Sequence, residues 1–248
     1  MPSEQSSPAK TGPALIAIGG LDPEGGAGLV RDWATAVERG ARPVLLGTAW
    51  TDQWATDGVA AVEPRGEIDL ARALQRALDR LGGWAAVKVG MIATPALARA
   101  VADVLGSSNV PVVFDPVLSA SSGGALFAGA PADLVPLLRR ADLLTPNAPE
   151  AAALTRLPVT TVDEARRAAT HLRTQGARAV LIKGGHLQGD AVDLLLTPEG
   201  ETLFSAPRLP GSPRGTGCAL ATAIAIELTH SPLPAAVATA KAWLRTRF

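Results

Sequence analysis

The chain has 248 residues, of which 47% are hydrophobic and 19% are charged, so we expect a globular fold with a sizeable core. Its 23 basic and 23 acidic residues balance, which leaves no net field to attract nucleic acid or anionic lipid. A single cysteine excludes an internal disulfide framework and any multi-cysteine metal site. The apolar runs are shorter than the roughly 18–20 residues that span a bilayer, and the first residues lack the features of a secretory signal. We therefore expect a soluble, cytoplasmic protein.

Short apolar runs alternate with stretches of helical periodicity along the chain. In order, we expect a strand at 14–18, a helix at 29–39, a strand at 43–48, a polar loop at 51–58, a helix at 68–81, a strand at 85–89 and a helix at 96–105. There follow a strand at 110–114, a helix at 132–139, a strand at 142–145, helices at 147–155 and 162–175, a strand at 179–183, a hairpin at 191–196 and 201–205, and helices at 219–228 and 234–245. This alternation predicts a single α/β domain over residues 13–248, after a disordered tail at 1–12, with a mostly parallel central sheet and helices on both faces.

Parallel α/β sheets bind their ligands at the carboxyl ends of the strands. Six chemically distinctive residues closely follow predicted strands: Asp22, Gln53, Met91, Asp115, Asn147 and Lys183. We therefore expect the active site at this edge of the sheet.

A glycine-rich segment at residues 214–218, Arg-Gly-Thr-Gly-Cys, precedes the apolar run at 219–228. Glycine lets the backbone approach a ligand closely, and the first N–H groups of a helix have no partner within it, so such a segment suits phosphate binding. The field at the helix start is expected to stabilise the thiolate of Cys218. The alternative is a glycine-rich turn before a buried helix, with Cys218 as a small core residue. Taken alone, the segment fits both interpretations.

Several common catalytic signatures are absent from the sequence. It has no Gly-x-x-x-x-Gly-Lys-Ser/Thr phosphate loop, no Gly-x-Gly-x-x-Gly after a strand, no His-Glu-x-x-His zinc motif and no Gly-x-Ser-x-Gly nucleophile elbow. Phosphoryl transfer requires only charge stabilisation of the moving group, a metal ion and a base for the attacking hydroxyl. The glycine-rich segment, the strand-end carboxylates and one lysine match those requirements.

Six segments occur in an order that is typical of one family. They are residues 20–28 (GLDPEGGAG), 88–91 (KVGM), 113–117 (VFDPV), 145–150 (TPNAPE), 183–186 (KGGH) and 214–218 (RGTGC). Together they resemble the hydroxymethylpyrimidine/phosphomethylpyrimidine kinases of thiamine biosynthesis, within the ribokinase-like superfamily. The resemblance covers almost the entire chain. It implies a ribokinase-like fold, the cofactors ATP and Mg²⁺, a small-molecule pyrimidine substrate and a homodimer.

The resemblance also implies a role for each matching residue. Gly215, Thr216 and Gly217 would form the anion hole for the transferred phosphoryl group, with Cys218 as the catalytic base. The substrate would contact Asp22, Gln53, Met91 and Val117. ATP would contact Asn147, Lys183, Thr216 and Lys241, and the metal would be held by Asp115 and Glu150. An amide such as that of Gln53 supplies both the donor and the acceptor that an aminopyrimidine edge requires.

The chain departs from the family pattern in three places. Around Gln53 it places the bulky Trp54 where the family has a small polar residue, with one apparent extra residue before Gly58, and Trp50 and Trp54 are candidates to line the pocket. Arg214 replaces the usual histidine, either as added charge beside the phosphate site or as a surface arginine. The first helix lacks the lysine that is expected after Asp32. Two alternatives therefore stay open: a pyridoxal or pyridoxine kinase, against which the cysteine at 218 argues, and a catalytically idle pyrimidine- or nucleotide-binding relative.

Overall fold

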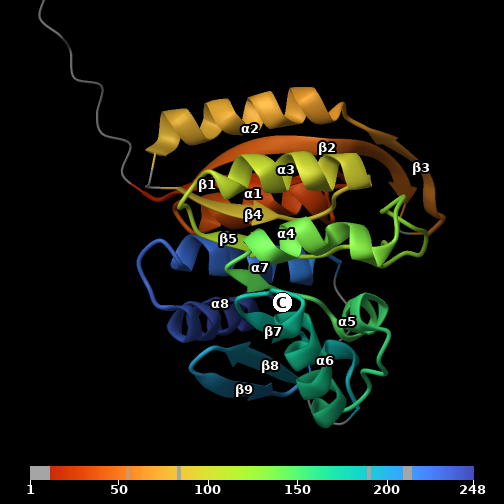
Figure 1. Ribbon diagram of the computed structural model, residues 1–248, viewed down its shortest axis with the longest axis vertical. Helices are drawn as coiled ribbons and strands as arrows, with labels where there is room; N and C mark the ends of the chain where they lie inside the picture. Colours follow the sequence, from red (N-terminus) through yellow and green to blue (C-terminus); the bar gives the residue numbers. More distant parts are fainter. Residues whose placement is uncertain (1–11, 55, 83–84, 189–190, 209–213) are drawn as a thin grey trace, which may run out of the picture.

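One nine-stranded sheet runs through the residues that the computed structural model describes, 12–54, 56–82, 85–188, 191–208 and 214–248 (Figure 1). Its strand order is β3-β2-β1-β4-β5-β6-β7-β8-β9. The strands are β1 (Ala14–Leu21), β2 (Arg42–Trp54), β3 (Gly58–Pro64), β4 (Ala85–Val89), β5 (Val112–Phe114), β6 (Leu143–Leu144), β7 (Val180–Ile182), β8 (Ala191–Thr197) and β9 (Gly200–Ala206). The six central strands, β2-β1-β4-β5-β6-β7, pair in parallel. At the edges, β3 pairs antiparallel with β2, β8 with β7, and β9 with β8.

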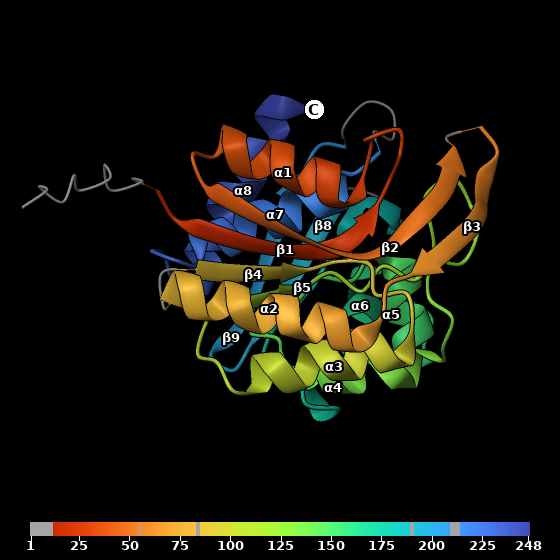
Figure 2. The same ribbon diagram turned by 90° about the horizontal axis from the view of Figure 1, so that it is seen from above.

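Helices cover both faces of this sheet (Figure 2). One face carries α1 (Gly28–Glu38), α7 (Thr216–Glu227) and α8 (Leu233–Arg247). The other carries α2 (Glu67–Leu81), α3 (Pro95–Gly106), α4 (Val135–Arg140), α5 (Ala148–Thr155) and α6 (Val162–Thr174). The predicted fold class, an α/β sheet with helices on both faces, is confirmed.

Side-chain alternation in the central strands divides the core into two layers. In β1, Leu15 and Ala17 pack in the layer that contains α1 and α7, and Ile16 and Ile18 pack in the layer of α2 and α3. A strand buried on both faces reads as a continuous apolar run, which is why residues 14–18 were predicted correctly. Helix α7 is buried along nearly its whole length, so its N-terminus is held in place against the sheet.

Strand β1 lies between β2 and β4, so the chain leaves β1 toward one side of the sheet and later returns on the other. The connections diverge at such a switch point, and the carboxyl ends of the two neighbouring strands leave room for a ligand between them. The segments that follow β1, β4 and β5 all reach this place.

The predicted polar loop at 51–58 is wrong. Residues 51–54 continue β2, and β3 pairs with them as an antiparallel partner that the sequence analysis did not predict. Thr51 and Gln53 are buried whereas Asp52 and Trp54 are exposed, which is the period of a half-buried strand hidden by its polar composition. Ala55 and residues 1–11, most of the predicted tail, lie outside the described residues, and Gly12 is exposed.

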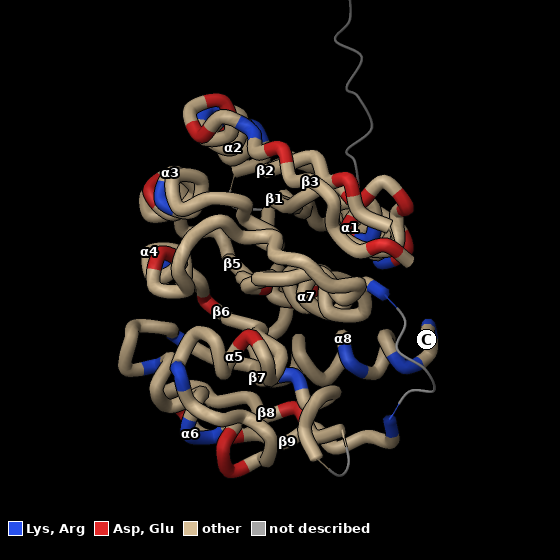
Figure 3. Tube along the Cα trace, turned by 90° about the vertical axis from the view of Figure 1, so that its right-hand side faces the viewer, with Lys and Arg blue, Asp and Glu red and all other residues tan. Residues whose placement is uncertain are grey.

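Charged residues of both signs are interspersed along the helices (Figure 3). This distribution agrees with the equal numbers of basic and acidic residues in the sequence. Among the described helices, none has both the length and the apolar character that a membrane crossing requires.

Candidate active site

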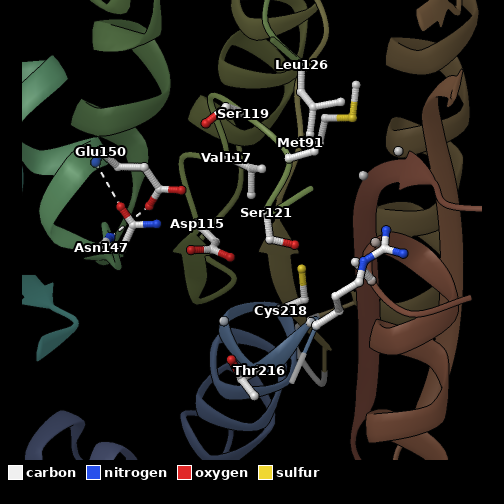
Figure 4. A pocket seen from close by; sticks show the side chains of 18 of the residues that line it. Met91, Asp115, Val117, Ser119, Ser121, Leu126, Asn147, Glu150, Thr216 and Cys218 are labelled. Atoms are coloured by element: carbon white, nitrogen blue, oxygen red, sulfur yellow. Dashed lines mark hydrogen bonds between the residues drawn. The ribbon is translucent and has the colours of Figure 1, made fainter. Parts of the chain in front are cut away.

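A cavity of about 470 Å³ opens at the carboxyl ends of the central strands. It is lined by Gly19, Gly20, Ala27, Gly28, Gln53, Lys88, Met91, Asp115, Val117, Ser119, Ala120, Ser121, Leu126, Asn147, Pro149, Glu150, Lys183, Gly185, His186, Arg214, Gly215, Thr216, Gly217 and Cys218. Figure 4 shows Asp115 and Ser121 near the Cys218 sulfur, with Met91 and Leu126 forming an apolar wall farther from it. The cavity therefore combines polar groups near the start of α7 with an apolar region of the kind that suits a small ring.

The N-terminus of α7 faces this cavity. Gly215 precedes the helix with φ of 77°, a left-handed conformation, and a Cβ at that position would lie 2.3 Å from the carbonyl oxygen of Gly26. Only glycine fits there without moving the backbone. The N–H groups of the first helical turn have no partner inside the helix, and the helix dipole adds positive potential at this end. The predicted phosphate cradle is thus sterically possible at residues 215–218.

Cys218 lies where two helix N-termini meet. The backbone N–H of Gly28, the first residue of α1, favours the thiolate of Cys218, while Cys218 itself belongs to the first turn of α7. Desolvation nevertheless raises the pKa of the Cys218 thiol, and the nearby Lys88 ammonium and the Gly28 N–H only partly offset it. The helix-start field that is expected to favour the thiolate therefore acts against the cost of burying a charge, which the sequence alone did not reveal.

Lys183 joins two carboxylates at the cavity wall. Its Nζ lies 2.6 Å from Asp115 Oδ1 and 3.9 Å from Glu150 Oε2. Burial opposes the charge of the Lys183 ammonium, but the Asp115 and Glu150 carboxylates outweigh it and raise its pKa. One ammonium cannot neutralise two carboxylates, and burial together with Asp115 raises the pKa of Glu150 to about 7.

Asn147 and Glu150 form a capping box at the start of α5 (Figure 4). Glu150 Oε2 accepts from the Asn147 N–H at 2.7 Å, and Asn147 Oδ1 accepts from the Glu150 N–H at 2.8 Å. This reciprocal arrangement satisfies two backbone donors and fixes both side chains. The Asn-x-x-Glu element is therefore also a structural device that presents Glu150 to Lys183.

Gln53, Met91 and Val117 all line the cavity, as predicted for substrate contacts. Gln53 is only 6% exposed, and an irregularity in the β2–β3 pairing falls between Asp52 and Gln53. The two tryptophans that flank this site, Trp50 and Trp54, are 68% and 49% exposed and are not among the lining residues. The suggestion that they line the pocket was wrong, because strand alternation turns them to the opposite side from Gln53.

Asp22 is buried but is not among the residues that line the cavity. Its carboxylate accepts from the N–H groups of Glu24 at 3.1 Å and Ala27 at 2.9 Å, and from Arg214 Nη2 at 3.1 Å. Arg214 also donates to Glu24 Oε2 at 2.6 Å. Arg214 is therefore neither a free surface residue nor an unpaired charge at the phosphate site: it ties the loop before α1 to the loop before α7.

A second cavity of about 300 Å³ continues from the first on the side of α8. Lys183, Thr216 and Gly217 line both cavities, and Lys241 lines only the second. Lys241 forms an ion pair with Asp193 of β8, whose other carboxylate oxygen accepts from the Gly184 N–H at 2.6 Å. Asn147 lies on the first cavity, so the structure divides the four residues predicted to bind ATP between two adjoining spaces.

Several polar residues that line the cavity had no predicted role, among them Lys88, Ser119 and Ser121. Lys88 of β4 is paired with Asp32 of α1 at 2.8 Å, and both side chains are buried. A lysine inside an otherwise apolar strand was the available signal, since a buried lysine needs a buried counter-ion.

The family model for Phosphomethylpyrimidine kinase matches residues 22–248. The chain belongs to this family. It is 38% identical over 242 residues to the hydroxymethylpyrimidine/phosphomethylpyrimidine kinase of Streptomyces coelicolor, with 96% of this chain and 89% of that protein covered. The family predicted from the six sequence segments is confirmed.

Solved structures with the same fold include two kinds of vitamin kinase. The phosphomethylpyrimidine kinase of Clostridium difficile 630 is 30% identical with a TM-score of 0.81, and the match covers 94% of this chain and 98% of that one. The pyridoxal kinase of Staphylococcus aureus in complex with AMP-PCP and pyridoxal is 27% identical with a TM-score of 0.82, covering 94% and 87%. The fold is ribokinase-like, as the resemblance implied.

Proposed function

We propose that this member of the family is an ATP- and Mg²⁺-dependent kinase that phosphorylates 4-amino-5-hydroxymethyl-2-methylpyrimidine, its monophosphate, or both. The observation that carries the proposal is the convergence, on one cavity, of the α7 N-terminus, Cys218 and Lys183 with its two carboxylates. Its relatives named hydroxymethylpyrimidine/phosphomethylpyrimidine kinase support the same conclusion. The assignment places the reaction in thiamine biosynthesis or salvage.

The acceptor ring is proposed to lie against Gln53, Met91 and Val117. The buried Gln53 amide offers one donor and one acceptor to the aminopyrimidine edge, and the other two side chains supply apolar walls. A substrate contact by Asp22 stays a prediction. The contacts of its carboxylate favour a role in holding the loop before α1.

The nucleotide is proposed to occupy the adjoining cavity, with its terminal phosphate at residues 215–218. Lys183 and Thr216 line both spaces and are therefore suited to contact the transferred group, while Lys241 belongs to the nucleotide side alone. The solved pyridoxal kinase complex with AMP-PCP supports use of an adenine nucleotide by this fold.

The donor set at Asp115 and Glu150 fits magnesium. Among the described residues no group of three or more His, Cys, Asp or Glu side chains is placed to hold a metal ion. Magnesium bound through nucleotide phosphates needs only one or two protein carboxylates, with water completing its six ligands. When bound there, the ion would neutralise charge on the phosphate oxygens. Lys183, between the two carboxylates, would hold them in position.

In this proposal Cys218, as a thiolate, accepts the proton of the acceptor hydroxyl. The hydroxyl oxygen forms a bond to the γ-phosphorus as the bond from that phosphorus to the bridging oxygen of ADP breaks, and the α7 N–H groups stabilise the charge on the moving group. A phosphate monoester acceptor is already ionised near neutral pH and brings no proton to remove. We therefore expect Cys218→Ala to lower kcat for the alcohol at least roughly tenfold, and kcat for the monophosphate by less.

One assay separates the proposal from its alternatives. Purified protein with Mg-ATP is offered the pyrimidine alcohol, its monophosphate or pyridoxal, and ADP release is followed. Turnover of the pyrimidines supports the proposal, whereas a preference for pyridoxal supports the related vitamin kinase activity. Absence of turnover with all three acceptors would refute a kinase and favour the idle binding protein. The homodimer stays a prediction, which sedimentation velocity tests.

A further inference from the structure

A fully buried ion pair lies between β4 and α1 beneath the candidate active site. Lys88 is 1% exposed, and its Nζ lies 2.8 Å from Asp32 Oδ2. The other carboxylate oxygen of Asp32 accepts from the Thr222 hydroxyl of α7 at 2.9 Å. Desolvating two charges costs several kcal/mol, and apolar side chains of similar volume often stabilise a core equally well. The stability of the fold therefore does not explain why the core holds a charged pair, Lys88 and Asp32, between β4 and α1.

The fold fixes the Lys88 ammonium close to Cys218. A Cβ at Gly90 would lie 2.5 Å from Lys88 Nζ, so the absence of a side chain at Gly90 makes the space for the ammonium. Thr222 follows Cys218 by four residues on α7, which puts both on the same face of the helix, one turn apart. The Asp32–Lys88 pair therefore contacts α7 on the face that carries the cysteine, and Lys88 and Cys218 line the same cavity.

Charged groups reach Cys218 from three elements. Lys88 of β4 is the strongest of them and favours the thiolate, whereas Asp32 of α1 and Asp115 after β5 oppose it. Burial works against the charge of Lys88 itself, but Asp32, Cys218 and Asp115 outweigh burial and raise the pKa of the ammonium. Lys88 therefore remains positively charged throughout the neutral pH range.

We propose that Lys88, held by Asp32 and Thr222, is a positioning residue whose fixed charge offsets the negative charge that Cys218 acquires as a thiolate. This inference rests on the proposed function, in which Cys218 is the base for the acceptor hydroxyl. Lys88 acts through Cys218 and is assigned no contact with the acceptor or the nucleotide. Burial destabilises the Cys218 thiolate relative to the thiol, and the positive charge of Lys88 offsets part of that destabilisation.

The test uses the fact that Cys218 is the only cysteine of the chain, so that alkylation by iodoacetamide reports on this thiol alone. The alkylation rate of the intact protein is measured from roughly pH 7 to 11.5 for the wild type, Lys88→Met and Asp32→Asn, because the pKa of the thiol lies above its ordinary 9.0. The midpoint is the pH at which the alkylation rate reaches half of its maximum. We expect Lys88→Met to raise this midpoint by about one pH unit or more, the range for losing a nearby opposite charge. Asp32→Asn removes a negative charge that opposes the thiolate, so it should lower the midpoint while Lys88 keeps its proton, which Asp115 and the Cys218 thiolate still favour. Structural damage alone would not move the two variants in opposite directions.

Arg178→Met is the control for loss of one positive charge, since Arg178 is exposed and paired with Asp142 outside the cavity. It should leave the midpoint unchanged. If Lys88→Met does not fold, Lys88→Met/Asp32→Asn removes both charges together, and the midpoint should still rise because Lys88 acts on Cys218 more strongly than Asp32 does. An unchanged or lowered midpoint in the folded Lys88 variant would overturn the inference.

A kinetic measurement supplies the second readout. Lys88→Met should lower kcat for the alcohol at pH 7 roughly tenfold, with recovery at higher pH and an unchanged KM for Mg-ATP. The alkylation experiment requires neither nucleotide nor acceptor. A wild-type protein without turnover would therefore refute the proposed function, whereas an absent midpoint shift would refute the role of Lys88.

Discussion

The strongest pH-dependent prediction concerns Glu150. Its side chain is buried, accepts from the Asn147 N–H at 2.7 Å, and shares the Lys183 ammonium with Asp115. Lys183 is closer to Asp115 by more than 1 Å, so the charge of Glu150 is the less well compensated of the two. Burial and the neighbouring Asp115 carboxylate raise the pKa of Glu150 from its ordinary 4.5 to about 7.

The sign of the effect follows from proton binding. Between pH 4.5 and 7 the unfolded chain has an ionised Glu150 whereas the folded chain keeps it protonated, so folding takes up a proton and stability falls as pH rises through this window. A shift of this size corresponds to about 3 kcal/mol of unfolding free energy, present below pH 4.5 and lost by about pH 7. Bound magnesium would favour the carboxylate, so the measurement belongs to the metal-free protein.

Urea unfolding from pH 4 to 8 measures the contribution of Glu150 to the unfolding free energy, with the variant Glu150→Gln as the comparison. Glutamine keeps an acceptor for the capping box but cannot ionise, so the difference between wild type and variant should change by about 3 kcal/mol across the window. Glu164→Gln is the matched control: Glu164 holds the same capping-box position on α6, but its pKa is lowered by hydrogen bonds from Thr160. Its pH dependence should have the opposite sign. A wild-type minus Glu150→Gln difference that is flat from pH 4 to 8 would refute the reasoning.

Two further predictions concern the cations of the site. Arg214→Ala should cost about 2 kcal/mol of unfolding free energy, because the buried Asp22 loses its only side-chain partner among the described contacts, and urea titration measures the loss. The matched change Arg166→Ala, which removes two exposed ion pairs, should cost less than about 1 kcal/mol, and equal losses in the two variants would contradict this account. Lys183→Met should raise the KM for Mg-ATP roughly tenfold or more, the cost of one charge-assisted contact, as initial-rate kinetics will show; an unchanged KM would remove Lys183 from the nucleotide site.

The central strands were predictable because each is buried on both faces and therefore reads as an apolar run. The prediction at 85–89 coincides with β4 even though Lys88 lies inside it. The strand at 51–54 was missed because its alternation carries Thr51 and Gln53 inward, and polar residues on an inward face do not look like a strand. Its partner β3 depends on this pairing, so both were missed together.

Pairings between distant segments set the limit of the sequence analysis at the candidate site. Asp32 and Lys88 are 56 residues apart, and Asp22 and Arg214 are 192 apart, so no local pattern joins either pair. The six family segments located most of the cavity lining, but they could not show that Asp22 faces the loop rather than the cavity. The desolvation that raises the pKa of Cys218 could not be predicted for a related reason, since the depth of a side chain is a property of the whole fold.

The chain departs from the family sequence pattern around Gln53 and at Arg214, and the structure shows how these departures bear on the choice of acceptor ring. Trp54 points to solvent and its indole N–H donates to Asp52 at 3.0 Å, so the substitution alters the outer surface of the β2–β3 hairpin and leaves the Gln53 amide at the cavity. Arg214 is occupied by Asp22 and Glu24, so it brings no unpaired charge to the acceptor. Neither departure alters the part of the cavity wall formed by Gln53, Met91 and Val117, where the acceptor ring is proposed to lie. In the proposed function, the Gln53 amide is therefore the group expected to discriminate between a pyrimidine and a pyridoxal ring, because its paired donor and acceptor match an aminopyrimidine edge.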